Sequence, residues 1–593
     1  MKPDLASIPF LQGADPMALR AAAEAASWFS VPAGVALFEA GEDSTCLYFL
    51  MSGSMAAFRS GPDGSPGLLG YIRPGEPVGE MALIAGEPHS ADVYAIRDCE
   101  LLRLEREDFD NIVRAHPSLM SQMARLMLQR ARMQPRTNPR AEPKVYALFS
   151  TSPTIDLVVR ARALKDGLAA IGKRATIVGE EAVERSSMWF DTLERENDIV
   201  LLVAPIGDSN WFRMCMRQAD RIWVLARADA KPAVPLLPEE AADSPAKRFR
   251  LVDVVLLHYG MDRKAAPTEV WRDAVDAARV FHWRNLDSPD CARLARVMAG
   301  QAIGLVLSGG GARAYAHIGV IRAMREAGVP FDIVGGTSMG AIVAACYAMG
   351  WDDNEIEDRI RRAFVESNPL GDYVLPVVAL TRGKRVESRL QEHFGDTLIE
   401  DLTVPFFCCS TDVCGGGVRV HRSGSLRFAL RATISLPGIL PPVVDPDGGL
   451  LVDGAVLQNF PVDVLQGLHR GPIVGVDVAR RSGLSVDDFK DPPGFFSWVA
   501  AHGMQNAPPI ASLLMRAATL AIDPWQGRAQ TDMLITPDMP DVDLRDWKEF
   551  DEAVASGYEA AVTAIRERPD ILAKARPQPS APALPHAQVQ AAD

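Results

Sequence analysis

Two glycine-rich turns constrain the fold of this 593-residue chain more than any other feature. The first turn is Ser308–Arg313 and the second is Gly335–Gly340. Each follows a short apolar run, Ile303–Leu307 or Phe331–Val334, that predicts a buried strand, and each precedes a helical pattern. We therefore expect two neighbouring strands of an α/β unit, each ending in a turn of small residues.

The second turn fits the pattern G-x-S-x-G, which is typical of a nucleophile elbow. In such an elbow a serine sits on a sharp strand-to-helix turn, and the glycines leave room for it and for a substrate. Gly336 and Gly340 would form the elbow around Ser338. The pattern thus predicts that Ser338 is a nucleophile.

The first turn offers consecutive backbone N–H groups at the start of a helix, which suits a developing oxyanion. The candidate donors are Gly309, Gly310 and Gly311, and with a nucleophile on the next strand they indicate acyl transfer to serine. An alternative is a dinucleotide-binding fingerprint that ends at Ala314, with Asp332 as the ribose ligand. A Walker phosphate loop is excluded because no Lys-Ser/Thr pair follows the glycines.

A serine hydroxyl is a poor nucleophile unless a base takes its proton. Asp453 follows an apolar run and precedes a turn glycine, and it is the candidate base of a Ser–Asp dyad. A Ser-His-Asp triad is the alternative, although no histidine downstream of Ser338 stands in a convincing motif. These histidines are His393, His421, His469, His502 and His586.

The Gly-Gly-Gly-x-Arg loop, the Gly-Thr-Ser-Met-Gly elbow and the late Asp-Gly pair together resemble the three signatures of patatin-like phospholipases. The stretches Arg431–Gly438 and Leu440–Pro442 are also similar to that family, and the resemblance covers residues 300–572. It implies that Ser338 is the nucleophile, that Asp453 is its base and that the loop amides form the oxyanion hole. It implies neither a metal nor a cofactor.

Residues 1–135 predict a small all-β roll flanked by helices. Short apolar runs are broken by Gly, Pro and Asp at close intervals, which is typical of such rolls. Helical patterns extend from Asp15 to Trp28 and from Arg106 to Met133. The expected strands are Ala36–Phe38, Leu47–Met51, Met55–Phe58, Leu68–Ile72, Asp92–Ile96 and Leu101–Leu104.

The run Val78–Ala91 within this roll resembles the phosphate cassette of cyclic-nucleotide-binding domains. Glu80 matches the glutamate that takes the ribose hydroxyl in that family. His89 stands at the position of the phosphate-binding arginine, where a neutral imidazole cannot supply a bidentate charged contact, and Asp92 adds a negative charge nearby. We expect the fold of such a domain, without cyclic-nucleotide binding at Glu80 and His89.

Residues 143–290 predict a doubly wound, Rossmann-like α/β unit, which a proline-rich linker at 134–143 precedes. The helical patterns are Ile155–Ala170 and Glu181–Glu196, and Trp211–Asp220 predicts a packed surface helix. The loop Ser150–Thr154 contains no glycine, so a nucleotide site is not expected. The expected strands are Val145–Phe149, Ala175–Val178, Ile199–Ala204, Ile222–Ala226 and Val252–Leu257.

The order of the three parts resembles the neuropathy target esterase group of lysophospholipases. This resemblance implies a serine esterase that hydrolyses lysophospholipid or phospholipid acyl esters through an acyl-enzyme. Within the enzymes, the alternative is a phospholipase A or an acyltransferase with the same dyad. Outside them, the alternative is a non-catalytic regulatory or nucleotide-sensing protein, against which the intact Ser338 and Asp453 argue.

Composition and charge constrain the partners and the compartment. A net charge of −14 argues against a nucleic-acid partner, and contact with anionic lipid would need a local apolar or basic patch. The eight cysteines show no metal-binding spacing, which suits reduced thiols in a cytosolic protein. We expect a cytoplasmic protein with peripheral contact to the inner membrane face, and we leave a homo-oligomer open.

Three further segments carry expectations. The chain begins without a signal-peptide pattern, and the uncharged run Val334–Trp351 predicts a buried core helix. Pro492–Trp525 holds aromatic and aliphatic residues among Pro and Gly, and it is the candidate entrance for an acyl chain. Residues 576–593 are rich in Pro and Ala and predict a disordered tail.

Overall fold

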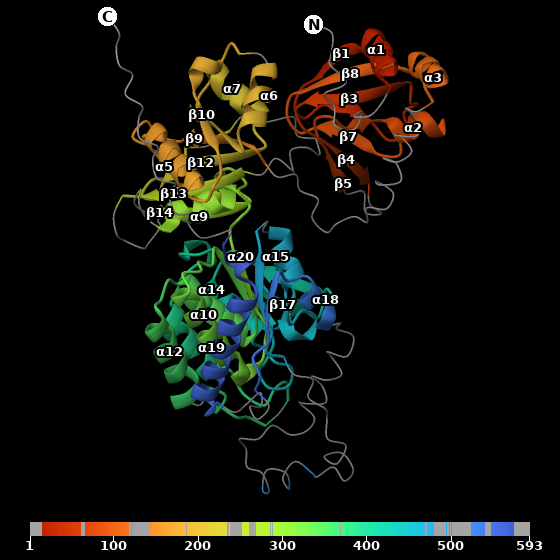
Figure 1. Cartoon of the computed structure of the whole chain (residues 1–593). Helices are drawn as coiled ribbons and strands as arrows, with labels where there is room; N and C mark the ends of the chain where they lie inside the picture. The colour runs from red at the N-terminus through yellow and green to blue at the C-terminus, as the bar shows by residue number, and fades with distance from the viewer. Residues whose placement is uncertain are drawn as a thin grey trace, which may run out of the picture. The chain divides into compact units, whose positions relative to one another are not determined.

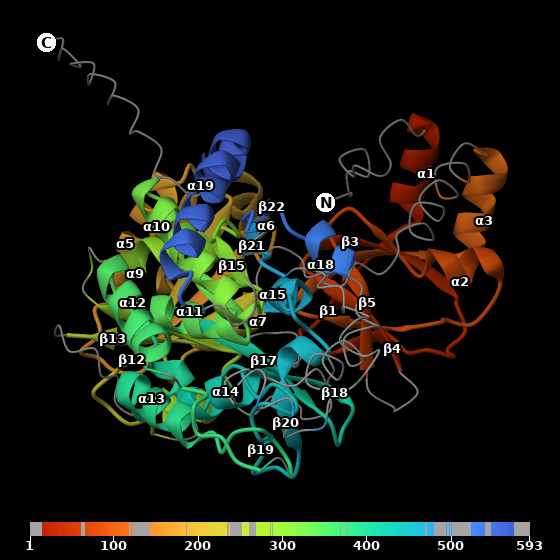
Figure 2. The same ribbon diagram turned by 90° about the horizontal axis from the view of Figure 1, so that it is seen from below.

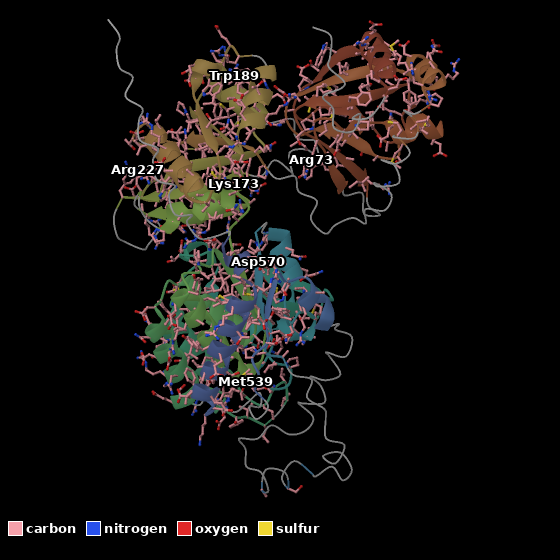
Figure 3. All side chains as sticks on the ribbon, viewed as in Figure 1. Arg73, Lys173, Trp189, Arg227, Met539 and Asp570 are labelled. Atoms are coloured by element: carbon pink, nitrogen blue, oxygen red, sulfur yellow. The ribbon has the colours of Figure 1, made fainter. Side chains whose placement is uncertain are left out.

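The computed structural model divides the chain into two compact units, residues 1–292 and 293–593 (Figure 1). Unit 1 contains a β-roll and an α/β module, and unit 2 contains a second α/β sheet. The side chains that fill them are drawn in Figure 3, where Arg73 marks the roll, Lys173 the module and Met539 unit 2. With short gaps, the structure describes residues 15–60, 66–117, 143–233, 252–259, 268–479, 524–539 and 547–573.

The β-roll consists of two four-stranded antiparallel sheets, in the orders β1-β8-β3-β6 and β2-β7-β4-β5. Buried aliphatic and aromatic residues from both sheets form its core, and Leu50, Met55 and Leu101 are fully buried there. Its elements are α1 (Pro16–Ala25), β1 (Ser27–Val31), β2 (Ala36–Phe38), β3 (Cys46–Ser52), β4 (Met55–Ser60), β5 (Pro66–Ile72), β6 (Pro77–Val78), α2 (Glu80–Ala85), β7 (Asp92–Ala95), β8 (Cys99–Glu105) and α3 (Arg106–Ala115).

The first helix ends earlier than the sequence pattern predicts. Helix α1 stops at Ala25, and Trp28 belongs to strand β1, where it pairs with Leu102 of β8. The helical prediction to Trp28 is therefore wrong, because pairing with a neighbouring strand outweighs local helix propensity. The predicted helix from Arg106 likewise ends at Ala115, and most of the segment from there to Met133 lies outside the described residues.

The α/β module of unit 1 is a six-stranded parallel sheet in the order β10-β11-β9-β12-β13-β14. All five predicted strands form, and each observed strand contains its predicted range. The strands are β9 (Val145–Ser150), β10 (Ala175–Val178), β11 (Ile199–Pro205), β12 (Arg221–Arg227), β13 (Val252–His258) and β14 (Arg279–Arg284). The helices are α5 (Leu157–Ala170), α6 (Ser187–Glu196), α7 (Asn210–Gln218), α8 (Thr268–Ala274) and α9 (Pro289–Met298), which crosses the boundary of the units.

Two features of this module escape the sequence pattern. Strand β14, which begins and ends with arginine, is not among the predicted strands. Its Arg279 donates to Asp253 of β13, a fully buried carboxylate that also binds Arg221. The predicted helix Glu181–Glu196 is in fact a 3-10 turn (Glu180–Ala182) followed by α6. The Glu181 carboxylate accepts the N–H of Gly179 beside that turn, which is a local bond that competes with helix continuation.

Unit 2 is built on a sheet in the order β19-β20-β17-β16-β15-β21-β22, with β18 also pairing with β17. Strands β17, β16, β15, β21 and β22 are mutually parallel, whereas β18, β19 and β20 run antiparallel to their neighbours. The strands are β15 (Gly304–Leu307), β16 (Ile333–Thr337), β17 (Phe406–Asp412), β18 (Gly417–His421), β19 (Val443–Val444), β20 (Leu450–Asp453), β21 (Ile473–Val476) and β22 (Met533–Ile535).

Helices cover both faces of this sheet. Figures 1 and 2 show α10, α12 and α19 on one side and α15 and α18 on the other. All ten residues of α11 are buried, as expected for the run Val334–Trp351. In the described part of the chain, no helix has the length and apolar character needed to cross a membrane. The helices are α10 (Ala316–Glu326), α11 (Met339–Ala348), α12 (Asp353–Ile360), α13 (Lys384–Phe394), α14 (Leu426–Thr433), α15 (Val462–Leu468), α18 (Pro524–Ala529), α19 (Phe550–Glu567) and α20 (Pro569–Ala573).

Strand β17 positions the functional residues of unit 2 because two strands share one of its edges. Its residues 406–409 pair with β16, its residues 408–412 pair with β18, and its residues 410–412 pair with β20. Each residue of β17 can pair with one strand on either side. Because β18 pairs with residues that also pair with β16 or with β20, both of these strands must lie on the other edge of β17, end to end. The chain leaves β16 at the point where β20 finishes.

Three predicted segments cannot be compared with the structure. The linker at 134–143 and the acyl entrance Pro492–Trp525 lie almost entirely outside the described residues. The tail at 576–593 lies wholly outside them.

Candidate active site

Ser338 stands on a strained turn between β16 and α11. Its backbone has φ 54° and ψ −131°, a conformation that is rare for any residue with a side chain and that usually marks a functional constraint. Gly336 and Gly340 flank it, and a Cβ at either position would collide with the backbone at the end of β15. The elbow therefore needs glycine on both sides, because β15 passes directly beside it.

The side chain of Ser338 meets Asp453 across the shared edge of β17. Thr337 pairs with Cys409, and the next residue of β17, Ser410, pairs with Asp453 at the end of β20. Ser338 and Asp453 thus reach the same level of the sheet from opposite directions. The hydroxyl of Ser338 donates to Oδ2 of Asp453 at 2.8 Å.

The carboxyl group of Asp453 is fully buried, and its surroundings set its protonation. Burial raises its pKa from 3.8 to about 7, while hydrogen bonds from the Ala455 amide and the Ser338 hydroxyl oppose that rise. The Ala455 N–H donates to Oδ1 at 2.8 Å, so both carboxyl oxygens have a partner. A carboxyl group with a pKa near 7 exchanges protons readily at neutral pH.

The end of α14 and the residues after it orient both members of the pair. The hydroxyl of Thr433 accepts the N–H of Ser338 at 2.9 Å and donates to the carbonyl of Cys409. The carbonyl of Ser435 accepts the N–H of Asp453 at 2.9 Å. The sequence of Arg431–Gly438 resembles the family but assigns no role to its individual residues, because only the fold brings this segment against the elbow.

The glycine loop after β15 lies beside the nucleophile. A Cβ on Gly309 would stand 3.1 Å from the Cβ of Ser338 and 2.5 Å from Oδ1 of Asn459. The N–H of Gly309 donates to the carbonyl of Asn459 at 3.2 Å, and the Asn459 side chain donates back to the carbonyl of Gly309. The sequence prediction counted three amides for an oxyanion, but that of Gly309 is engaged, which leaves those of Gly310 and Gly311.

His317 at the start of α10 supports this loop and was not identified from the sequence. Its ring is fully buried, and because a carbonyl can only accept, Nε2–H must donate to the Ser308 carbonyl at 2.9 Å. Burial lowers the pKa of His317 to about 4, so the ring is neutral at neutral pH. The contact fixes the carbonyl at the entry of the glycine loop.

The histidines considered for a triad lie elsewhere or cannot be compared. His421 on β18 is buried and shares a hydrogen bond with Ser410. Neither ring nitrogen of His393 on α13 has a hydrogen-bond partner among the residues that the structure describes. His469, His502 and His586 fall outside the described residues. Among the described side chains, the hydrogen-bond acceptor of the Ser338 hydroxyl is Asp453.

The dinucleotide interpretation of the glycine loop does not fit the position of Asp332. This residue is buried just before β16 and forms a bidentate ion pair with Arg296. It also accepts the N–H of Ile303. A ribose ligand must lie at the carboxyl end of the strands, whereas Asp332 lies at the amino end and is already satisfied. Asp332 therefore does not fit the ribose ligand of the dinucleotide alternative.

An apolar cavity of about 430 Å³, counting its open mouth, lies against α11. Ile342, one helical turn after Ser338, and Ile434, the neighbour of Thr433, line it. A π-helical turn, Arg361–Glu366, contributes Phe364 to its wall. The space within it that a water-sized molecule can reach is about 30 Å³, and its apolar walls suit an aliphatic group.

In the β-roll, Glu80 and His89 lie beside the same glycine turn. Glu80 is the first residue of α2 and is buried, and Gly79 before it adopts φ 83°. The His89 ring stacks on Phe38 with 3.6 Å between ring centroids, and a Cβ at Gly79 would stand 3.3 Å from its Cε1. Burial lowers the pKa of His89, so at neutral pH it is an uncharged ring packed against an aromatic ring.

Three family models match the chain in the order of its parts. They are a cyclic nucleotide-binding domain at 28–116, a Neuropathy Target Esterase family P-loop like domain at 147–284 and a patatin-like phospholipase at 305–465. Among solved structures, the chain is similar to the Thermus thermophilus Catabolite Activator Protein, with 27% identity and a TM-score of 0.21 over 28% of this chain and 68% of that one. That score is too low to carry an argument.

Two relatives extend the likeness beyond single domains. An uncharacterized NTE family protein of Mycobacterium tuberculosis is 34% identical over 588 residues, which cover 96% of this chain and 97% of that protein. Patatin-like phospholipase domain-containing protein 6 of Homo sapiens is 29% identical over 534 residues, which cover 79% of this chain and 38% of that protein. The chain therefore belongs to the neuropathy target esterase family, whose patatin-like phospholipase domain is associated with lipid ester hydrolysis.

Proposed function

We propose that this protein is a serine esterase that hydrolyses the acyl esters of lysophospholipids or phospholipids through a Ser338–Asp453 dyad. The observation that carries the proposal is the 2.8 Å hydrogen bond from the strained Ser338 to the buried Asp453. A hydroxyl that donates to an enclosed carboxylate has its base already in position. The family supports lipid esters as the substrate class.

The reaction takes two steps with the same groups. In the first, the Ser338 proton passes to Asp453 while Oγ bonds to the ester carbonyl carbon. The amides of Gly310 and Gly311 stabilise the negative charge on the carbonyl oxygen. The carbon–oxygen bond to the leaving alcohol then breaks, and the alcohol takes the proton from Asp453. In the second step, water replaces serine by the same route, which releases a fatty acid and restores Ser338.

Gly309 contributes to this chemistry by its lack of a side chain. Its N–H binds Asn459, and this bond holds the loop in place for the two amides that follow. A larger residue would press on both Asn459 and Ser338. We assign Gly309 and Asn459 as positioning residues and Gly310 and Gly311 as the donors.

The alternatives differ in what accepts the acyl group or whether chemistry occurs at all. An acyltransferase with the same dyad would pass the acyl group to an alcohol in place of water, and a phospholipase A would accept two-chain lipids. The apolar cavity lined by Ile342 would accept an aliphatic group in each case. A purely regulatory role leaves the strain at Ser338 and the burial of Asp453 without purpose.

We further propose a cytoplasmic location with peripheral contact to the inner face of the membrane. Seven of the eight cysteines are buried and unpaired, which suits a reducing compartment. We also propose that the N-terminal module does not sense cyclic nucleotides. The uncharged His89, packed on Phe38, offers no charge to a phosphate, and the module serves instead as a docking element.

Ser338→Ala should abolish both covalent labelling by a fluorophosphonate probe and ester hydrolysis, because no other group supplies the attacking oxygen. Intact-mass measurement after labelling and hydrolysis of a lysophospholipid panel test this. Ser410→Ala, a buried serine at the same level of the sheet, is the matched control and should still label. Persistent labelling of the Ser338→Ala protein would contradict the assignment.

Asp453→Asn should lower turnover by about a hundredfold or more, since a positioned base contributes about that much. His421→Gln, which removes a buried imidazole one strand away, should lower it far less. A loss of turnover in the His421 variant as large as that in Asp453→Asn would favour a Ser-His-Asp triad over the dyad. Steady-state rates on a soluble ester provide the measurement.

The Asp453→Asn protein should be more stable than the wild type at alkaline pH. The pKa of Asp453 in the folded protein, about 7, exceeds the ordinary value of 3.8, so near neutral pH the folded protein holds a proton there that the unfolded chain has released. The contribution of this carboxyl group to the free energy of unfolding is fully present below about pH 4, and it is lost as the pH rises to about 7. Thermal unfolding at pH 8 should give a higher midpoint for Asp453→Asn, and a lower one would contradict the burial penalty.

The pH profile of kcat/KM should follow the same carboxyl group. Asp453 must be ionised to accept the serine proton, so kcat/KM on a neutral, soluble ester should fall about tenfold per pH unit below pH 7. It should level off above that value. A profile that stays flat down to pH 5 would show that the base titrates elsewhere.

Cyclic AMP and cyclic GMP should give no saturable heat at micromolar concentration in titration calorimetry. Loss of a bidentate charged contact costs about 1.5–3 kcal/mol, or about a tenfold to hundredfold in affinity. A micromolar signal with either nucleotide that disappears in Glu80→Ala would show that His89 does not disable the cassette.

A further inference from the structure

The four most exposed large hydrophobic side chains of the described residues gather on two segments of unit 2. Val377 is 93% exposed, Leu375 75% and Val378 66%, and all three lie between α12 and α13. Val444 of β19 is 71% exposed. Single exposed aliphatic residues are ordinary, but a cluster of the most exposed ones marks an interaction surface.

Backbone hydrogen bonds connect the strand-like arms of the first segment to the chain that leads into β19. Tyr373 and Thr381 form an antiparallel bridge, and the N–H of Val374 donates to the carbonyl of Leu380, so the three aliphatic residues occupy the turn between them. The N–H groups of Leu380 and Thr381 then donate to the carbonyls of Gly438 and Ile439. The chain from Ile439 runs directly into β19.

The surface adjoins the proposed catalytic pair. Strand β19 pairs with β20, which ends at Asp453, and Gly438 follows Ser435 by three residues. Ser435 supplies the carbonyl that accepts the Asp453 N–H. Figure 2 shows β19, β20 and α14 together at the same end of unit 2. The chain that binds the turn therefore continues into the residues that hold Asp453.

A basic rim follows the turn directly. Arg382, Lys384 and Arg385 are exposed at the start of α13, in a chain whose net charge is −14. The nearby Asp372 carboxylate accepts the backbone N–H groups of Lys384 and Arg385, so its charge serves the helix start. Near Val444, Asp445 and Asp447 both pair with Arg419.

We propose that the turn Leu375–Val378, Val444 and the rim of Arg382, Lys384 and Arg385 form an interfacial surface that docks on an anionic lipid bilayer. The aliphatic tip enters the acyl boundary while the basic rim contacts lipid phosphates. The inference rests on the proposed esterase function and locates where that enzyme meets its substrate. A protein interface is disfavoured, because such interfaces are rich in aromatic residues and poor in lysine.

Vesicle sedimentation with the Ser338→Ala protein tests the surface apart from catalysis. The probes are phosphatidylcholine vesicles with and without phosphatidylglycerol. The double variant Leu375→Asp/Val377→Asp should bind anionic vesicles at least about tenfold more weakly, because two aliphatic side chains no longer enter the bilayer. Val158→Asp, at an exposed aliphatic position on α5, is the matched control and should bind unchanged.

The rim is tested by Lys384→Glu/Arg385→Glu. Each lost basic contact near an anionic surface weakens binding about fivefold, and charge reversal adds to that. Binding should fall at least about twentyfold on anionic vesicles, and raised salt should narrow the difference from the parent protein. Arg162→Glu/Lys165→Glu, an exposed basic pair on α5, should retain the parent affinity.

Unchanged vesicle binding in both test variants, with unfolding midpoints equal to that of the parent, would overturn the proposal. If the double aspartate variant unfolds, the milder Val377→Asn and Val444→Asn variants decide in its place. Light scattering that shows a dimer dissociated by the same changes would assign the surface to a second copy and overturn the lipid assignment. Failure of Ser338 labelling is read in a separate assay and concerns the proposed function alone.

Discussion

The arrangement of unit 2 depends on the edge of β17 that β16 and β20 share. Along β17, the pairing with β16 stops at Cys409 and the pairing with β20 starts at Ser410. The residue that follows β16 and the last residue of β20 therefore meet at one level. Those residues are Ser338 and Asp453. A shift of one residue in either register would point the carboxyl group at the opposite face of the sheet and separate the pair.

The conformation of the site lowers local stability, and packing of the surrounding core offsets that loss. Ser338 keeps a strained backbone, and Asp453 keeps a carboxyl group with no countercharge among the groups that bind it. Fixed donors and acceptors surround both: the hydroxyl of Thr433, the amide of Ala455 and the carbonyl of Ser435. A water-shielded carboxyl group is a better base at neutral pH than an exposed one, because its pKa lies closer to the working pH.

The differences between expectation and structure share one reason, which is that a local pattern does not show which partner a residue meets. Trp28 continues a helical pattern but pairs with β8, and β14 begins with Arg279, which binds the buried Asp253. Asp332 stands at the spacing of a ribose ligand but is bound to Arg296. In each case the tertiary partner decided the role of the residue.

The sequence by itself determined the order of the three parts, most strands of the parallel sheets, and Ser338 and Asp453 as the candidate pair. These follow from short-range physics: buried strands need continuous apolar runs, and tight turns need glycine. Only the tertiary structure decided that Asn459 binds the Gly309 amide, that Thr433 and Ser435 hold the pair, and that Leu380 and Thr381 bind Gly438 and Ile439. These contacts join residues far apart in the chain, and strand register, which no local pattern encodes, sets which of them form.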